Sequence, residues 1–313
     1  MTAAAEVAAE AAGSAAGSAA GWAASLELDA WRDGDTTRSR SRHVGPLRLL
    51  KALYPEGPEV CHQVLVHPPG GIVGGDHLDV AFALGECSHV LLTTPGATRW
   101  YRSDGRPAQQ HVRLTLAAGA RLEWLPSETI AHPGCLATSR VELDLAPGAE
   151  AMLSELLVLG LPASGQPFAG DADGCFEQHL AWPGRWLERG RIRAVDRLLL
   201  DSPLGLGGQP VVGTLAFCAR DAGDGTPADT ARALARQEAL VEAARAIVDE
   251  SSVPGSADAA LRAGVTGVHP EVTLLRVVAA KAEPAQRLMR AVWTRWRALA
   301  WRLSSAPPRL WRC

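Results

Sequence analysis

A short pattern of alternating residues occurs three times in this chain, and it limits the possible folds more than any other feature. The copies are "VAFALGECSHVLLTT" from Val80, "VRLTLAAGARLEWLP" from Val112 and "VELDLAPGAEAMLSE" from Val141. Each reads as an alternating strand, a turn of small residues and a second strand; the later two carry Gly at the eighth place, and the first reaches its glycine sooner. The repeat predicts stacked strand-turn-strand units, as in a β-helix-like solenoid or another layered β architecture. A sandwich of hairpins would leave a similar pattern, so the repeat predicts a mainly β fold and leaves its topology open.

Further β-strands are expected where short apolar runs end at Gly, Pro or polar clusters. Together with the repeats they imply a mainly β chain, because few segments carry any other periodicity. The further candidates are Val60 to Val66, Glu150 to Leu159, Phe176 to Trp182, Arg191 to Leu200, Gly213 to Ala219 and Val272 to Ala279.

Two segments towards the C-terminus have the spacing of α-helices. The first, near 227–250, follows Thr226 as its N-cap and starts with Pro227. The second, near 284–304, is basic and amphipathic, and its apolar stripe is expected to dock on a sheet or a partner instead of a membrane. The stripe consists of Leu288, Val292, Trp296 and Leu299, and the arginines expected largely elsewhere are Arg287, Arg290, Arg295 and Arg297.

Composition and charge exclude several classes of function. The 313 residues carry 31 basic and 34 acidic side chains, a net charge of -3, which gives no overall field for holding nucleic acid or an anionic membrane. The six cysteines are too widely spaced for a zinc knuckle or a compact disulfide framework, which favours reduced thiols in the cytoplasm. No apolar run is long enough to span a bilayer. The sequence also lacks a P-loop, a GxSxG nucleophile elbow and an HExxH zinc motif.

A Gly- and Pro-rich stretch, "HPPGGIVGGDH", lies between two predicted strands. Its glycines do not have the spacing of a phosphate-binding loop, and an alternating strand follows it instead of a helix, so a tight turn is favoured. A turn accounts for the glycines but leaves Asp76 unexplained. His67 and His77 flank the stretch.

The segment "LLTTPGATRWYRS" concentrates hydrogen-bond donors and aromatic rings. Two interpretations have equal weight: a buried polar network that fixes a loop, or a docking surface, since Arg, Trp and Tyr are the usual anchors of protein interfaces. The residues concerned are Thr94, Arg99, Trp100, Tyr101 and Arg102.

In the later segment "RLEWLPSETI", strand alternation puts Leu122 and Trp124 on one face and Glu123 on the other. Acidic residues placed in this way on a layered β protein are either solvated or line an internal wet passage.

These motifs together resemble one family. "CHQVLVHPPGGIVGGDHLDV", "LLTTPGATRWYRS", "LEWLPSETI" and the closing "PPRLWRC", with "GPLRLLKALYPEG" before them, are similar to the urease accessory protein family UreD, also called UreH. The resemblance covers residues 22–313 as a single domain and leaves outside it only an Ala-, Gly- and Ser-rich tail, 1–21, which is expected to be disordered. It implies a mainly β stack of strands with two helices.

The resemblance also implies a function. UreD-like proteins are not enzymes; they join UreF and the GTPase UreG on apo-urease so that nickel reaches the urease active site. In the family a water-filled tunnel is proposed to pass the metal, which implies nickel in transit and no tightly bound cofactor. By matching position, the tunnel candidates here are Asp76, Glu123, Glu128 and Glu155. Carboxylate oxygens suit transit because they hold such a metal more weakly than a thiolate or multi-histidine cage.

The chain departs from the family pattern at one place, where "LGLPASGQPF" has Leu161 and Gln166 at positions of an expected Arg and Glu. Losing both removes an ion pair or a partner contact. Three alternatives to nickel conduction follow: a docking chaperone that opens apo-urease without contacting nickel, a divergent paralogue with an altered partner, and, least favoured, an enzyme with a nucleotide site.

Overall fold

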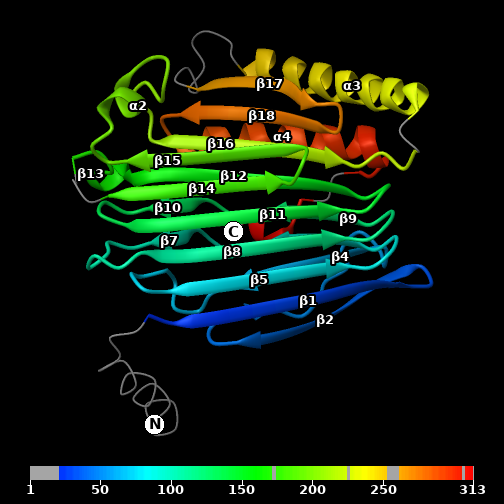
Figure 1. Cartoon of the computed structure of the whole chain (residues 1–313), viewed down its shortest axis with the longest axis horizontal. Coiled ribbons are helices and arrows are strands. Elements are labelled where there is room, and N and C mark those ends of the chain that lie inside the picture. Colours follow the sequence, from blue (N-terminus) through cyan, green and yellow to red (C-terminus); the bar gives the residue numbers. More distant parts are fainter. Residues whose placement is uncertain (1–20, 171–173, 224–225, 252–260, 305–306, 313) are drawn as a thin grey trace, which may run out of the picture.

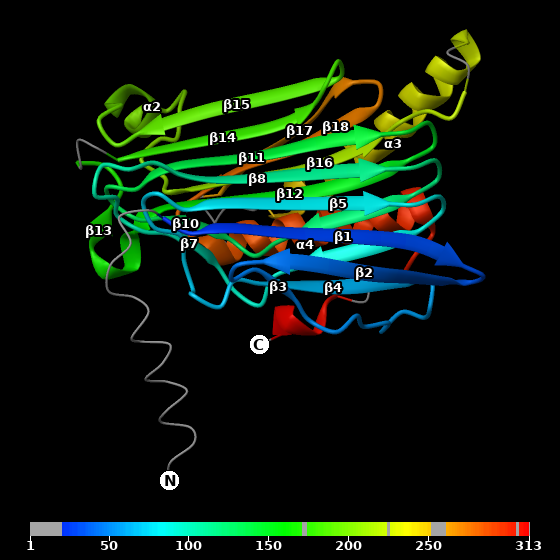
Figure 2. The ribbon, with the colours of Figure 1, turned by 60° about the horizontal axis from the view of Figure 1, so that its bottom comes forward.

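The chain folds into two β-sheets that lie face to face, with two long helices against the outer face of the second sheet (Figures 1 and 2). The computed structural model describes residues 21–170, 174–223, 226–251, 261–304 and 307–312. The predicted tail, 1–21, therefore lies outside the described residues except for its last position. No helix of the described chain is long and apolar enough to cross a membrane.

The first sheet has seven strands. In spatial order they are β15 (Trp186–Arg193), β14 (Cys175–Trp182), β11 (Leu136–Leu145), β8 (Ala108–Leu116), β5 (His77–Leu84), β1 (Ala23–Asp33) and β2 (Thr36–Val44).

The second sheet has eleven strands. Its main path is β17 (Arg262–His269), β18 (Val272–Ala279), β16 (Val211–Ala219), β12 (Glu150–Leu161), β9 (Arg121–Leu125), β6 (His89–Thr93), β4 (Val60–Val66) and β3 (Arg48–Leu49). Three short strands lie beside this path: β7 (Thr98–Trp100), β10 (Thr129–Ala131) and β13 (Gln166–Pro167).

The three sequence repeats form the centre of the stack. Their first strands, β5, β8 and β11, are parallel neighbours with Val80, Val112 and Val141 in register. Their second strands, β6, β9 and β12, are parallel neighbours in the other sheet. Because the two strands of each repeat belong to opposite sheets, the repeats are solenoid-like turns and not hairpins.

The turns of the three repeats have equal length, which the sequence comparison misjudged. Gly119 and Gly148 both adopt left-handed backbone, with φ of 68° and 78°. The equivalent position of the first repeat is Cys87, with φ of 54°, and not the earlier Gly85. A Cβ is uncommon in this conformation, so Cys87 occupies a turn position that normally favours glycine.

Two separate apolar cores result from this arrangement. Phe82, Leu114 and Trp124 belong to the core between the sheets, where the rings of Phe82 and Trp124 meet edge to face. Met152 and Trp296 belong to the core between the second sheet and the helices. The central strands of the second sheet are thus buried on both faces, which explains their nearly continuous apolar sequences.

Both predicted long helices are present: α3 (Pro227–Ser251) and α4 (Ala282–Trp301). The Thr226 hydroxyl accepts a hydrogen bond from the Asp229 N–H, and the Asp229 carboxylate accepts one from the Thr226 N–H, a reciprocal cap at the start of α3. The apolar stripe of α4 packs on the second sheet, as expected, although Leu299 is exposed.

One predicted strand is wrong. The range Arg191 to Leu200 contains the end of β15 and then a short helix, α2 (Arg197–Asp201). The Asp196 carboxylate accepts a hydrogen bond from the Leu199 N–H at 3.0 Å and caps this helix. Single 3-10 turns occur at Pro162–Ser164 and Arg309–Arg312.

Candidate functional site

The four acidic residues predicted for nickel passage lie in different places. Asp76 closes the Gly-rich loop: its Oδ1 accepts the Trp22 N–H at 2.8 Å and its Oδ2 accepts the Val73 N–H at 2.9 Å. The side chain is buried. It therefore joins the loop to the start of the first strand, which accounts for the acid that a simple turn left unexplained.

The Gly-rich loop is packed too tightly for larger side chains. A Cβ on Gly71 would come within 2.2 Å of the Tyr101 ring, and Gly75 has a φ of 95°. The loop is therefore a turn that needs its glycines for close packing and left-handed backbone. Behind it lies a cavity of about 190 Å³ whose polar lining includes His67, Thr94 and Gln110.

The five residues proposed for docking divide between the interior and the surface. Trp100 is buried against Phe176, edge to face at 5.8 Å. Thr94 is also buried, and its hydroxyl accepts the Ser127 N–H at 2.9 Å. For these two the loop-fixing interpretation is right and a docking role is wrong.

The other three residues of that set remain accessible. Arg99 and Arg102 are exposed, and Tyr101 is half-buried with its ring 4.8 Å from that of His132. A docking role for these three stays a prediction.

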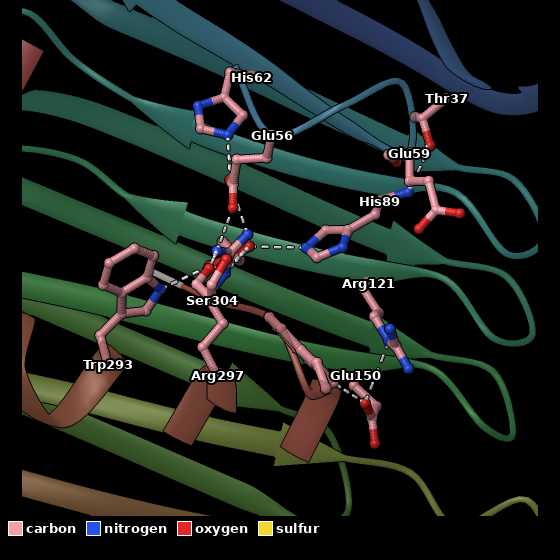
Figure 3. A network of polar contacts seen from close by, with 12 residues as sticks. Thr37, Glu56, Glu59, His62, His89, Arg121, Glu150, Trp293, Arg297 and Ser304 are labelled. Carbon is pink, nitrogen blue, oxygen red and sulfur yellow. Dashed lines mark hydrogen bonds and ion pairs between the residues drawn. The ribbon is translucent and has the colours of Figure 1, made fainter. Parts of the chain in front are cut away.

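Glu123 lies at the centre of a buried polar network beneath α4 (Figure 3). It projects from the helix-facing side of β9, as the alternation with Leu122 and Trp124 predicted. The Trp293 indole N–H donates to its carboxylate at 2.6 Å, His89 Nε2 lies 2.8 Å away, and Arg297 Nε lies 3.1 Å away.

Arg297 extends this network to a second carboxylate. Its two terminal nitrogens donate to both oxygens of Glu56, at 2.5 and 2.9 Å, and one also donates to the Ser304 carbonyl at 2.7 Å (Figure 3). His62 Nε2 lies 2.7 Å from Glu56. Arg297 is fully buried, so the expectation that it lies away from the packed face of α4 is wrong.

We call this group the α4 network: Glu56, His62, His89, Glu123, Trp293 and Arg297. Burial alone would raise the pKa of Glu123, but the hydrogen bond and charge of His89, the charge of Arg297 and the Trp293 bond lower it below its usual value. The pKa of Glu56 is lowered in the same way, against burial, by His62 and Arg297. Both carboxylates are therefore ionised and fully paired.

Glu128 lies on the loop after β9, half-buried, where Gln286 of α4 donates to its carboxylate at 2.9 Å. It is outside the α4 network and also outside the space between the sheets.

Glu155 faces the space between the two sheets. The Trp124 indole N–H donates to one oxygen at 3.3 Å and the Gln178 amide to the other at 3.4 Å, both long bonds. No positively charged side chain pairs with it among the described residues. Burial, opposed by these two bonds and assisted by the charge of Glu188, raises the pKa of Glu155 to about 7.

Sequence analysis missed the second carboxylate at this place. Glu188 projects inwards from β15; one oxygen pairs with Arg276, and the other is buried with no hydrogen-bond partner. Arg276 also donates to the Thr214 hydroxyl at 3.3 Å. The alternation of "WLERGRIR" could have identified Glu188, but the strand was placed five residues too late.

We call this second group the inter-sheet polar site: Glu155, Gln178, Glu188, Thr214 and Arg276. Thr214 and Arg276 are the cross-strand neighbours that follow Glu155 across the second sheet, and Gln178 and Glu188 come from the first sheet. Two acidic side chains and one incompletely paired oxygen thus meet in a mainly apolar interior. Across the described chain, no three His, Cys, Asp or Glu residues are arranged to hold a metal ion.

The two positions at which the sequence departs from the family pattern are direct neighbours. Leu161 on β12 pairs with Gln166 on β13, around the turn at Pro162–Ser164. An Arg and a Glu at these positions would face one another across the two strands, as the expected ion pair requires.

The fold and the sites together define a class: a mainly β protein of solenoid-like stacked strands, with two long C-terminal helices over one sheet. The family model described as UreD urease accessory protein matches residues 23–312. This chain therefore belongs to the UreD urease accessory protein family, as the motifs predicted.

Individual relatives agree with the family model. The urease accessory protein UreD of Leptothrix cholodnii (strain ATCC 51168 / LMG 8142 / SP-6) is 50% identical over 278 residues, which cover 89% of this chain and 94% of that protein. The urease accessory protein UreD of Paracidovorax citrulli (strain AAC00-1) is 48% identical over 288 residues, which cover 92% of this chain and 98% of that protein.

Proposed function

We propose that this protein is a non-enzymatic urease maturation factor that works in the cytoplasm with UreF, UreG and apo-urease and conducts nickel to the urease active site. Family membership supports the maturation role. The observation that carries the nickel step is the inter-sheet polar site, where Glu155 lacks a paired cation and one oxygen of Glu188 lacks any partner.

The chemistry of this site suits a cation in transit. Carboxylate, amide and hydroxyl oxygens bind a divalent first-row metal ion more weakly than thiolates or several imidazoles do. A buried carboxyl with a pKa near 7 also exists in part as its anion at neutral pH, so it can accept a cation and release it. Nickel is here the cargo of the protein and not a resident cofactor.

A test is urease activation with the double variant Glu155→Gln/Glu188→Gln, which keeps the size of both side chains. We expect the nickel content of the recovered urease to fall by about tenfold or more, while UreF, UreG and apo-urease still co-purify. The matched control is Glu142→Gln/Glu177→Gln, which removes two carboxylates from the opposite, outer face of the first sheet. Nickel content within about twofold of wild type in the first variant would contradict the conduction step.

A docking chaperone that never contacts nickel is the second candidate. It is favoured by Asp76 and Glu123, two acidic candidates whose carboxylates are already engaged, one by backbone N–H groups and the other by the α4 network. The same experiment separates the two functions, because a docking chaperone predicts normal nickel loading by Glu155→Gln/Glu188→Gln.

A further inference from the structure

The C-terminal part of the chain is strongly basic in a protein that is slightly acidic overall. Between positions 281 and 312 there is one acidic residue, Glu283, while the whole chain has a net charge of -3. Such a local excess marks a surface that attracts anionic groups. The basic residues of this part are Lys281, Arg287, Arg290, Arg295, Arg297, Arg302, Arg309 and Arg312.

Several of these charges are already used within the protein. Arg297 belongs to the α4 network, and Arg287 pairs with Glu283 at 3.2 Å. The Arg290 guanidinium lies 4.4 Å from the centre of the Trp311 ring. In contrast, Arg295 and Arg302 are exposed, and neither forms an ion pair with any described residue.

The surface of α4 between these two arginines is open and small. Ala291, Arg295, Ala298 and Arg302 follow one another at helical spacing and are all exposed, and Leu299 beside them is 41% exposed. Small side chains between long cations allow another helix to approach closely. The apolar stripe of α4 is occupied by the second sheet, so this face is what α4 offers to a partner.

We propose that the outer face of α4, formed by Ala291, Arg295, Ala298, Leu299 and Arg302, is a docking surface for an acidic helix of a protein partner. The inference rests on the proposed function only because it takes that partner from the same assembly. It does not depend on nickel passing between the sheets. Arg295 and Arg302 would supply charge complementarity, and Ala298 and Leu299 the close contact.

The surroundings of α4 favour a protein over a lipid surface or a nucleic acid. Leu299 is its one large exposed apolar side chain, which is too little for insertion into a membrane interface. The neighbouring helix α3 exposes four acidic side chains, which would repel a phosphate backbone. These are Glu238, Glu242, Asp249 and Glu250.

The test compares two variants with the same change of charge. Arg295→Glu/Arg302→Gln alters the outer face of α4. Arg189→Glu/Arg193→Gln alters two exposed arginines of β15 that also have no ion-pair partner among the described residues. All four side chains are exposed, and thermal unfolding confirms that both variants keep the fold. UreF, UreG and apo-urease serve separately as purified probes, each over a range of salt concentrations.

We expect the α4 variant to bind one of the three probes at least about tenfold more weakly, with a flatter salt dependence, while the β15 variant binds within about twofold of wild type. Equal losses in both variants, or no loss for any probe, would overturn the proposal. Binding of wild type to vesicles with 30% phosphatidylglycerol that the α4 variant loses would assign the surface to lipid instead. Self-association of wild type that the α4 variant abolishes would assign it to a second copy, with α3 of that copy as the acidic face.

A further variant keeps the test independent of charge and of the proposed function. Ala298→Gln lengthens the side chain in the middle of the surface and should also weaken the affected probe. Glu155→Gln/Glu188→Gln should bind that probe as wild type does. Loss of nickel delivery without loss of this binding would then contradict neither proposal, whereas normal delivery with lost binding through α4 would contradict the conduction step alone.

Discussion

The α4 network and the inter-sheet polar site both bury two carboxylates, yet their electrostatics are opposite. In the α4 network each carboxylate meets a guanidinium and an imidazole, and the pKa of Glu123 is lowered. In the inter-sheet polar site Glu155 meets only an indole and an amide at long distances, and its pKa rises to about 7. The same residue type is thus held as a paired anion in one place and as an underpaired acid in the other.

The difference separates a structural role from a role in transport. A paired buried anion costs much free energy to disturb, and it fixes how a helix sits on a sheet. An underpaired carboxyl lowers the stability of the fold, a cost that proteins tend to retain at functional sites. Four substitutions test this division, beginning with the largest expected effect.

Replacing Arg297 by Met should destabilise the protein most. The change leaves Glu56 and Glu123 buried without their shared cation, and breaking a buried ion pair from one side costs about 3–5 kcal/mol. Urea unfolding measures the loss. Arg287→Met, which removes the exposed ion pair with Glu283, is the control and should cost less than about 1 kcal/mol. Equal losses would mean that the α4 network does not anchor the helix.

Replacing Glu155 by Gln should have the opposite sign at neutral and higher pH. The folded state keeps the Glu155 proton up to a pKa of about 7, whereas the ordinary value is 4.5. Between these values the folded state binds more protons than the unfolded state, so this stabilising contribution is complete below about pH 4.5 and is lost as pH rises to about 7. The Gln variant lacks this loss.

Urea unfolding of both proteins at several pH values measures the difference. Near pH 4.5 the variant should match wild type, and above pH 7 it should be more stable by up to about 3 kcal/mol, since each pKa unit corresponds to about 1.4 kcal/mol. Glu142→Gln, on the exposed face of the first sheet, should show no such dependence. A constant difference across the whole pH range would contradict the raised pKa of Glu155.

The stacked architecture could be predicted from sequence because its signal is local and repeated. Val80, Val112 and Val141 occupy equivalent places in the pattern and are neighbours in the sheet. The turn was harder, since Cys87 stands where the other repeats have glycine, and only the backbone angle identifies it.

The α4 network could not be predicted, because its parts are distant in sequence and ordinary in type. Arg297 is one of several arginines on α4, and its partners Glu123 and Glu56 are 174 and 241 residues away. Nothing in the pattern of the helix distinguishes Arg297 from Arg295, which is exposed. Only tertiary packing decides which of them becomes buried.

Replacing Trp293 by Phe tests a single contact of the α4 network. The ring is kept, but the indole N–H that donates to Glu123 at 2.6 Å is lost. A hydrogen bond to a charged group contributes about 1.5–3 kcal/mol, so we expect a loss of about 2 kcal/mol in urea unfolding. The pKa of Glu123 should move upwards, because that bond helps to lower it. A loss below about 0.5 kcal/mol would show that His89 and Arg297 alone satisfy this carboxylate.

Replacing Trp124 by Phe is the matched change in the inter-sheet polar site, and its effect should be the smallest. It too removes one indole N–H from a buried carboxyl, but the bond to Glu155 is 3.3 Å long and its acceptor is protonated below a pH of about 7. At about pH 6 we expect a loss of less than about 1 kcal/mol beyond the packing cost of the smaller ring, which Trp124→Phe in the Glu155→Gln background measures. The loss should grow above pH 7, where the bond would serve a carboxylate anion. Equal losses for Trp124→Phe and Trp293→Phe at pH 6 would mean that the two regions hold their acids equally well, and the distinction between anchor and transport site would fail.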